Sequence, residues 1–245
     1  MAIIRQGYIG PDVGKVQQDL VEAGFTIDAQ ELSASAFGDS TRAAVVGFQI
    51  CHKGPDGHVL LDDGVVGPKT QWALENPGTS SKNPGGKYIS SGWRRDPSRD
   101  VLKLVLDAAV GEIGVHEIPD GSNRGPDVDK YGGDGQPWCA FWASWCYKRL
   151  DTGSPFGVIG SAKGVYSWAE QHNRLLSEAE AVSPVPGDIF IILRADGHGH
   201  VGIIVGKPDN DAVKVCTVEG NCSNAVRGML RDKFSFSGIA RPVPL

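Results

Sequence analysis

A segment rich in proline, glycine and serine limits what this chain can fold into. Residues 77–87 read Pro-Gly-Thr-Ser-Ser-Lys-Asn-Pro-Gly-Gly-Lys and carry little apolar surface that a core could bury. This composition is typical of semi-flexible linkers, and we expect the linker to reach Pro97. The sequence therefore predicts two domains, residues 1–76 and residues 98–245, joined by a linker over residues 77–97.

The overall composition is that of a folded protein without a strong attraction to polyanions. Of the 245 residues, 40% are hydrophobic and 22% are charged, which suffices for packed cores in both domains. The net charge is −5 and neither domain is basic, so we expect no binding to nucleic acid or to membranes. The chain shows neither an 18-residue apolar run nor the apolar core of a signal peptide, which predicts synthesis in the cytoplasm without a signal peptide.

The cysteines do not suggest a disulfide framework. There are five of them at irregular spacings, so at least one thiol is free. We expect Cys139 to be free and Cys146 to be a small buried side chain. Cys216 and Cys222 flank a turn, and a bond between them is left open.

The N-terminal domain contains a short internal repeat. Residues 37–45 (Phe-Gly-Asp-Ser-Thr-Arg-Ala-Ala-Val) return as residues 66–74 (Val-Gly-Pro-Lys-Thr-Gln-Trp-Ala-Leu). Both copies are typical of helix starts, because capping residues or a proline at the first helical position precede apolar residues on one face. An earlier apolar stripe predicts a helix from about Asp12 to Gly24. Residues 1–76 are therefore predicted to form a small three-helix domain.

The C-terminal domain changes its hydrophobic pattern near Pro186. Helical periodicity marks residues 98–111, 139–150 and 161–172. Short β-rich runs follow at residues 188–193, 200–206, 212–219 and 226–230, with a last one near residues 237–241. Helices followed by strands predict an α+β fold in which helices pack on an antiparallel sheet.

A cysteine, a histidine and two polar residues occur in the order expected of a nucleophilic hydrolase. Cys139 lies at the predicted start of a helix, where the helix dipole favours a thiolate. His200 opens an apolar strand and is the predicted base; His198 lies among glycines in the preceding loop. Glu219 and Asn221 follow on the next predicted strand.

The third catalytic group has two candidates. Glu219 and Asn221 are two residues apart, so on an extended strand both side chains project from one face. We prefer Glu219 as the group that orients the imidazole, although a bulge at Gly220 would change which way the two residues face. For the oxyanion, the backbone N–H of Cys139 is the first predicted donor and Gln136 the second.

The catalytic region resembles the CHAP family of cysteine- and histidine-dependent amidohydrolases and peptidases. The resemblance spans about residues 98–245 and rests on short motifs in a fixed order. These motifs are Trp138-Cys139-Ala140, Pro186-Gly187-Asp188-Ile189, Gly199-His200-Val201, Glu219-Gly220-Asn221 and Gly238-Ile239-Ala240-Arg241-Pro242. The resemblance implies a papain-like fold and catalysis by Cys139, His200 and Glu219 with Asn221 in support. We also expect Gln136, Trp138 and His198 to contribute to substrate binding in the cleft.

The N-terminal domain resembles the peptidoglycan-binding domains of wall hydrolases. The matching stretches are residues 13–20, residues 37–49 and residues 63–74, with a Gly-x-x-Thr start in both later helices. The resemblance implies peptidoglycan as the partner, although a helical spacer would show most of the same residues.

No metal site is predicted. The sequence has neither His-Glu-x-x-His nor a paired Cys-x-x-Cys, and we expect no cofactor. Some CHAP domains bind calcium through an acidic loop before the cysteine. Asp127, Asp129 and Asp134 occur at that place, but they lack EF-hand spacing and are equally expected in a polar surface turn.

Together these features predict a monomeric peptidoglycan hydrolase that cleaves an amide in the peptide part of the wall after release from the cell. The bond between muramic acid and L-alanine is preferred over a peptide cross-link. Two alternatives are a non-catalytic wall-binding protein with a degenerate hydrolase fold and an amidase of a substrate outside the wall.

Overall fold

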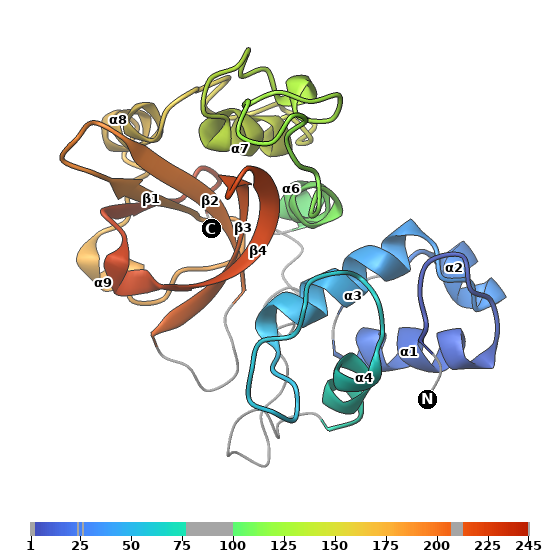
Figure 1. Cartoon of the computed structure of the whole chain (residues 1–245). Coiled ribbons are helices and arrows are strands. Elements are labelled where there is room, and N and C mark those ends of the chain that lie inside the picture. Colours follow the sequence, from blue (N-terminus) through green and yellow to red (C-terminus); the bar gives the residue numbers. More distant parts are fainter. Residues whose placement is uncertain (1–2, 24, 26, 77–99, 207–212, 245) are drawn as a thin grey trace. The chain divides into compact units, whose positions relative to one another are not determined.

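The protein mixes helices with one sheet and divides into two compact units. A computed structural model describes residues 3–23, 25, 27–76, 100–206 and 213–244 (Figure 1). The first unit falls within residues 1–96 and the second within residues 97–205 and 213–245. The predicted linker over residues 77–97 lies outside the described residues. The α+β class is confirmed.

The first unit is helical. Its helices are α1 (Pro11–Glu22), α2 (Ala29–Ala34), α3 (Asp39–Cys51) and α4 (Pro68–Glu75). The three predicted helices correspond to α1, α3 and α4. The short helix α2 was not predicted, because it buries none of its residues and so leaves no periodic apolar signal.

Two buried glutamines explain the internal repeat. Gln17 Nε2 donates to the carbonyl of Ala36 at 2.8 Å and to Thr41 Oγ1 at 2.9 Å. Gln49 Nε2 repeats the arrangement with the carbonyl of Val65 at 3.0 Å and Thr70 Oγ1 at 3.1 Å. Gln17 thus joins α1 to the start of α3, and Gln49 joins α3 to the start of α4, so the threonine in each copy is a packing residue.

We expect Gln49→Ala to destabilise the first unit by about 3 kcal/mol, because buried partners lose their hydrogen bonds. Gln49 is 1% exposed, and its Oε1 also accepts the Gly64 N–H at 2.9 Å. Hydrogen exchange in peptides from residues 39–76 measures the free energy of opening. Gln18→Ala, at an exposed position on α1, is the matched control and should change that free energy by less than about 0.5 kcal/mol. Equal effects of the two substitutions would contradict the assigned role of Gln49.

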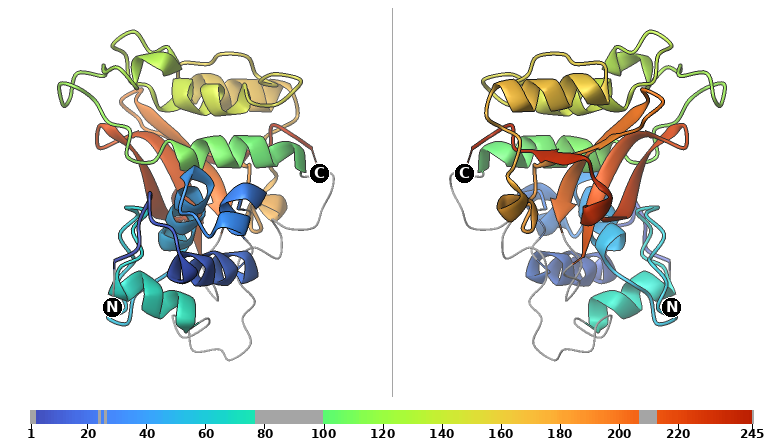
Figure 2. Two further views of the ribbon diagram at one scale, coloured as in Figure 1. Left: turned by 90° about the vertical axis from the view of Figure 1, so that its right-hand side faces the viewer. Right: turned by 90° about the vertical axis from the view of Figure 1, so that its left-hand side faces the viewer.

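The second unit is an antiparallel sheet with helices packed on it. The helices are α6 (Asp100–Gly111), α7 (Cys139–Tyr147), α8 (Ala162–Gln171) and α9 (Glu178–Ala181), with the 3-10 turns η2 (Asp129–Tyr131) and η3 (Lys233–Ser235). The strands are β1 (Ile189–Leu193), β2 (Gly199–Gly206), β3 (Lys214–Cys222), β4 (Ala225–Asp232) and β5 (Gly238–Ala240), in the order β4-β3-β2-β1-β5. Helices α6 and α7 contact β3, and α8 contacts β1 and β5 (Figure 2).

Helix α7 approaches β3 closely because of one glycine. A Cβ atom at Gly220 would lie 2.6 Å from the Cβ of Trp142, so only glycine allows this contact. Trp142 is fully buried, as are most residues of α7. Burial on nearly all sides fixes the position of the helix and of Cys139 at its start.

Two of the motifs that carry the CHAP resemblance meet in an ion pair. Arg241 donates from Nε to Asp188 Oδ1 and from Nη2 to Asp188 Oδ2, both at 2.8 Å. Asp188 is 1% exposed and immediately precedes β1, whereas Arg241 immediately follows β5. The pair therefore closes the edge of the sheet where these two strands are neighbours.

Two expectations about the whole chain can be compared with the structure. Among the helices of the described ranges, none has the length and apolar character needed to cross a membrane. Cys139, Cys146 and Cys222 are free thiols, so the bond considered between Cys216 and Cys222 is not formed.

Candidate active site

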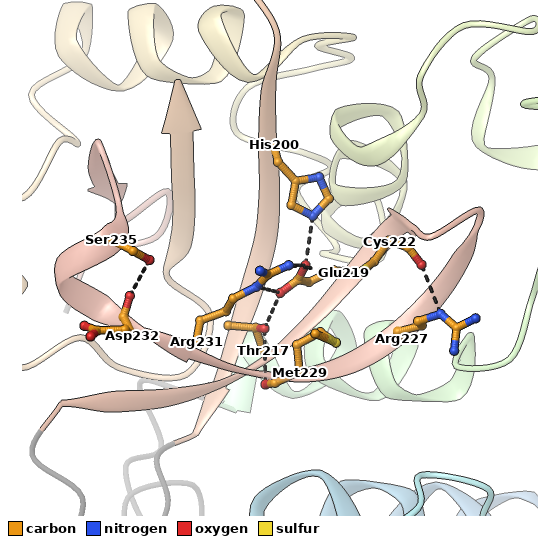
Figure 3. A network of polar contacts seen from close by, with 9 residues as sticks. All are labelled: His200, Thr217, Glu219, Cys222, Arg227, Met229, Arg231, Asp232 and Ser235. Carbon is orange, nitrogen blue, oxygen red and sulfur yellow. Dashed lines mark hydrogen bonds and ion pairs between the residues drawn. The ribbon is translucent and has the colours of Figure 1, made fainter. Parts of the chain in front are cut away.

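A completely buried carboxylate lies at the centre of the candidate site. Glu219 on β3 is 0% exposed and is surrounded by three donor side chains (Figure 3). Arg231 on β4 donates from Nε to Oε1 at 2.8 Å and from Nη2 to Oε2 at 2.6 Å. Thr217 Oγ1 donates to Oε1 at 2.6 Å. This set of donors satisfies a charge that would otherwise be costly to bury.

The surroundings of Glu219 keep it ionised. Burial by itself would raise its pKa, but the hydrogen bonds from Arg231, His200 and Thr217 outweigh burial and lower the pKa to about 2. At neutral pH Glu219 is therefore a fixed negative charge and a hydrogen-bond acceptor.

His200 on β2 is held by that carboxylate. Its Nε2 lies 2.8 Å from Glu219 Oε2, so Nε2 carries the proton of this bond and Nδ1 remains for Cys139. Burial alone would lower the pKa of His200, but hydrogen bonds and charge from Cys139 and Glu219 raise it to about 9. The site thus favours an imidazolium beside the cysteine.

Cys139 is the first residue of α7. The positive end of the helix dipole favours negative charge at this position, as does the neighbouring imidazolium. Cys139 and His200 both line an open cavity of about 260 Å³. The described residues that line the cavity are Pro137, Cys139, Arg194, Gly199, His200, Asn221, Cys222, Ser223 and Arg231. Cys139 is thus a largely buried residue, 6% exposed, that borders a groove.

The other free thiols have a different environment. Burial raises the pKa of Cys146 well above its ordinary value. Burial, with the charge of Glu219, raises the pKa of Cys222 to about 11. Neither thiol is activated.

Asn221 does not reach His200. The pairing of β3 with β4 shifts register between Glu219 and Cys222, and Asn221 has a left-handed φ of 54°. The bulge turns its amide toward Asn123, whose Oδ1 lies 2.9 Å from Asn221 Nδ2. With the amide turned over, Asn221 instead donates to Glu117 Oε1 and accepts the Trp138 N–H, both at 3.1 Å. The expectation that Glu219 and Asn221 project together is wrong at this point.

The residues predicted for the cleft are only partly near it. Trp138 is 0% exposed, stacks on Tyr131 and donates from Nε1 to Glu117 Oε1 at 2.9 Å. Its side chain therefore does not face substrate, and that expectation is wrong. Gln136 is exposed in the turn before Pro137, and His198 is exposed in the turn between β1 and β2. Neither is among the described residues that line the cavity.

Four functional candidates were missed by sequence reasoning. Thr217 and Arg231 contact Glu219, Arg194 lines the cavity, and Glu117 is a carboxylate only 2% exposed beneath Trp138. The sequence does hint at Arg231, because the basic residues at positions 227 and 231 lie on the same face of a strand. The register of the β3–β4 hairpin pairs Glu219 with Arg227 and Val215 with Arg231, so only the side-chain bonds show that Arg231 reaches Glu219.

No metal cluster occurs in the part of the chain that the structure describes. Groups of three or more His, Cys, Asp or Glu side chains with a suitable arrangement are absent there. Asp134 pairs with Arg124 at 2.8 Å, and Asp129 Oδ1 accepts the Gly125 N–H at 3.3 Å. The independence from metal and cofactor stays a prediction.

Residues 131–221 match the CHAP domain family, a segment that contains Cys139, His200 and Glu219. The match agrees with the resemblance over this segment. The peptidoglycan-binding resemblance of the first unit stays a prediction.

The solved structures to which the chain is similar include a phage endolysin and a bacterial amidase/peptidase fusion protein. An endolysin of Burkholderia AP3 phage is 28% identical over 51% of this chain and 42% of that chain, with a TM-score of 0.26. A fused Zn-dependent amidase/peptidase/peptidoglycan-binding domain-containing protein from Clostridium acetobutylicum ATCC 824 is 18% identical over 84% of this chain and 57% of that chain, with a TM-score of 0.27. The chain thus spans about half the length of these proteins, and no curated protein sequence matches it.

We expect Cys139→Ala to lower the pKa of His200 from about 9 toward its ordinary value near 6.5. The substitution removes one of the two groups that raise this pKa and leaves the opposing effect of burial in place. The imidazole nitrogen shifts in an NMR titration measure the change. Ser235→Ala, in the turn η3, is the control. A His200 that titrates identically in both variants would show that the thiol does not interact with the imidazole.

Proposed function

We propose that the second unit is a cysteine hydrolase that cleaves an amide bond in the peptide part of peptidoglycan. The observation that carries the proposal is the bond from His200 Nε2 to the buried Glu219, which leaves Nδ1 for Cys139 at the start of α7. The CHAP match over residues 131–221 supports this reaction class.

The proposed reaction uses Cys139 as nucleophile and His200 as proton carrier. The Cys139 thiolate attacks the carbonyl carbon, and the oxygen of the tetrahedral intermediate accepts the Cys139 N–H, which has no acceptor within the helix. His200 gives its Nδ1 proton to the amine as the C–N bond breaks, leaving a thioester. His200 then takes a proton from water, and the resulting hydroxide releases the acid and restores the thiolate. Glu219 holds the imidazole through Nε2 throughout.

The substrate bond and the partner of the first unit are further parts of the proposal. We favour the amide between muramic acid and L-alanine over a bond within the peptide. The first unit would bind peptidoglycan and raise the local substrate concentration for a monomeric enzyme, through tethering alone. Action on the wall requires release from the cell in which the chain is made.

Digestion of purified peptidoglycan tests the reaction. We expect the wild type to release stem peptides from glycan, and Cys139→Ala to lower the rate by at least about a thousandfold because the nucleophile is lost. Mass spectrometry of the products identifies the bond, since free stem peptides indicate an amidase and opened cross-links an endopeptidase. Parallel reactions with chelator test the absence of a metal requirement.

The possible results separate the alternatives. If both proteins bind sacculi and neither releases a product, the chain is a wall-binding protein and not an enzyme. Hydrolysis of a soluble amide with intact sacculi would point to a substrate outside the wall.

Alkylation tests the identity of the nucleophile. We expect iodoacetamide at pH 7 to label Cys139 at least about tenfold faster than Cys222 or Cys146, because a thiol with a pKa of about 11 is almost entirely protonated at pH 7. Peptide mapping after timed labelling measures the three rates. Faster labelling of Cys222 would contradict the assignment.

A further inference from the structure

The groove at Cys139 is basic although the protein is acidic. Two arginines, Arg194 and Arg231, are among the described residues that line it, and no aspartate or glutamate is. The whole chain carries a net charge of −5, so the charge of the groove opposes that of the molecule. A local field of this sign attracts an anionic group of the substrate.

Most charges in the site compensate one another. Arg231 forms a bidentate ion pair with Glu219, which together contribute no net charge. The imidazole of His200 is bonded to the same buried Glu219. Arg194 is different, because the described residues include no carboxylate in an ion pair with it. Of the two arginines that line the groove, Arg231 is therefore paired with a carboxylate of the described residues and Arg194 is not.

Arg194 has a fixed position beside His200. It directly follows β1, whose Ile192 pairs with His200, and its N–H donates to the carbonyl of His198 at 2.9 Å. The neighbouring Asp196 accepts the His198 N–H at 3.0 Å and does not line the groove. The backbone of the turn thus holds the arginine at the rim, while its exposed side chain remains available.

We propose that Arg194 binds a free carboxylate of the substrate close to the amide that is cleaved. The inference rests on the proposed function and deepens it, since it names the substrate class as anionic stem peptides rather than amidated ones. A guanidinium suits this role because its parallel N–H groups match the two oxygens of a carboxylate. Arg231 lines the same groove but is committed to Glu219, so Arg194 determines this specificity.

The test compares sacculi that differ only in their carboxylates. Both preparations are first N-acetylated to block free amines, and one is then treated with carbodiimide and excess ammonia to convert carboxylates into carboxamides. Each amide cleaved exposes a new amine, which gives the initial rate whichever bond is cut. We expect the wild type to cut native sacculi at least about tenfold faster than amidated sacculi.

The same comparison with Arg194→Gln identifies the responsible residue. We expect the variant to lose the preference for native sacculi while cutting amidated sacculi at the wild-type rate, which also shows that it is folded. Lys148→Gln removes the same charge from an exposed position outside the described lining of the groove and should keep the full preference. In partially amidated sacculi, mass spectrometry of the released fragments should show one carboxylate that is never amidated, and its position identifies the ligand.

The outcomes distinguish the inference from the function beneath it. Equal wild-type rates on both preparations, or a preference that persists in Arg194→Gln, would overturn the inference and leave the hydrolase intact. No amine release from native sacculi would remove the proposed function and the inference with it.

Discussion

The ion pair between Glu219 and Arg231 is the interaction on which the rest of the site depends. A carboxylate with no exposed surface can remain ionised only where donors replace water, and Arg231, Thr217 and His200 do so. Because Glu219 is ionised, it fixes the imidazole through Nε2 and favours its protonated form. The sheet supplies this geometry, since β2, β3 and β4 are neighbours and each contributes a member of the network. The order of the strands in the sheet therefore brings His200, Glu219 and Arg231 together.

Cys139 is positioned by a second set of contacts on the same strand. Gly220 lets Trp142 of α7 approach β3, and the bulge that follows turns Asn221 toward Glu117 and Trp138. Glu117 also accepts the Asn123 N–H at 2.8 Å, so one buried carboxylate joins the loop before α7 to the end of β3. The Glu-Gly-Asn motif thus has three separate tasks. Glu219 orients the histidine, Gly220 admits the helix, and Asn221 holds the residue before the cysteine.

The sequence predicts periodic and local features well and predicts contacts across the sheet poorly. The helix that begins at Cys139 and the strand that begins near His200 follow from apolar patterns and caps, and the structure places both side chains at one groove. The expectation that Asn221 faces the same way as Glu219 is wrong, because a bulge interrupts the alternation of side chains along β3. Trp138 was assigned to the cleft although its indole N–H meets a buried carboxylate 21 residues earlier in the chain. The pattern of β4 does not single out Arg231, because the hairpin register places Arg227 opposite Glu219 and Arg231 reaches the carboxylate from four residues further along the strand.

The distribution of charge separates catalysis from recognition. Inside the site the charges meet in one cluster, in which Glu219 pairs with both Arg231 and His200. Arg194 stands apart from both pairs, on a turn at the rim of the groove. Under the proposed function, a change at Arg194 would alter which substrate binds without disturbing how the bond is broken. Loss of Arg231 would leave the charge of the buried Glu219 uncompensated and would affect both.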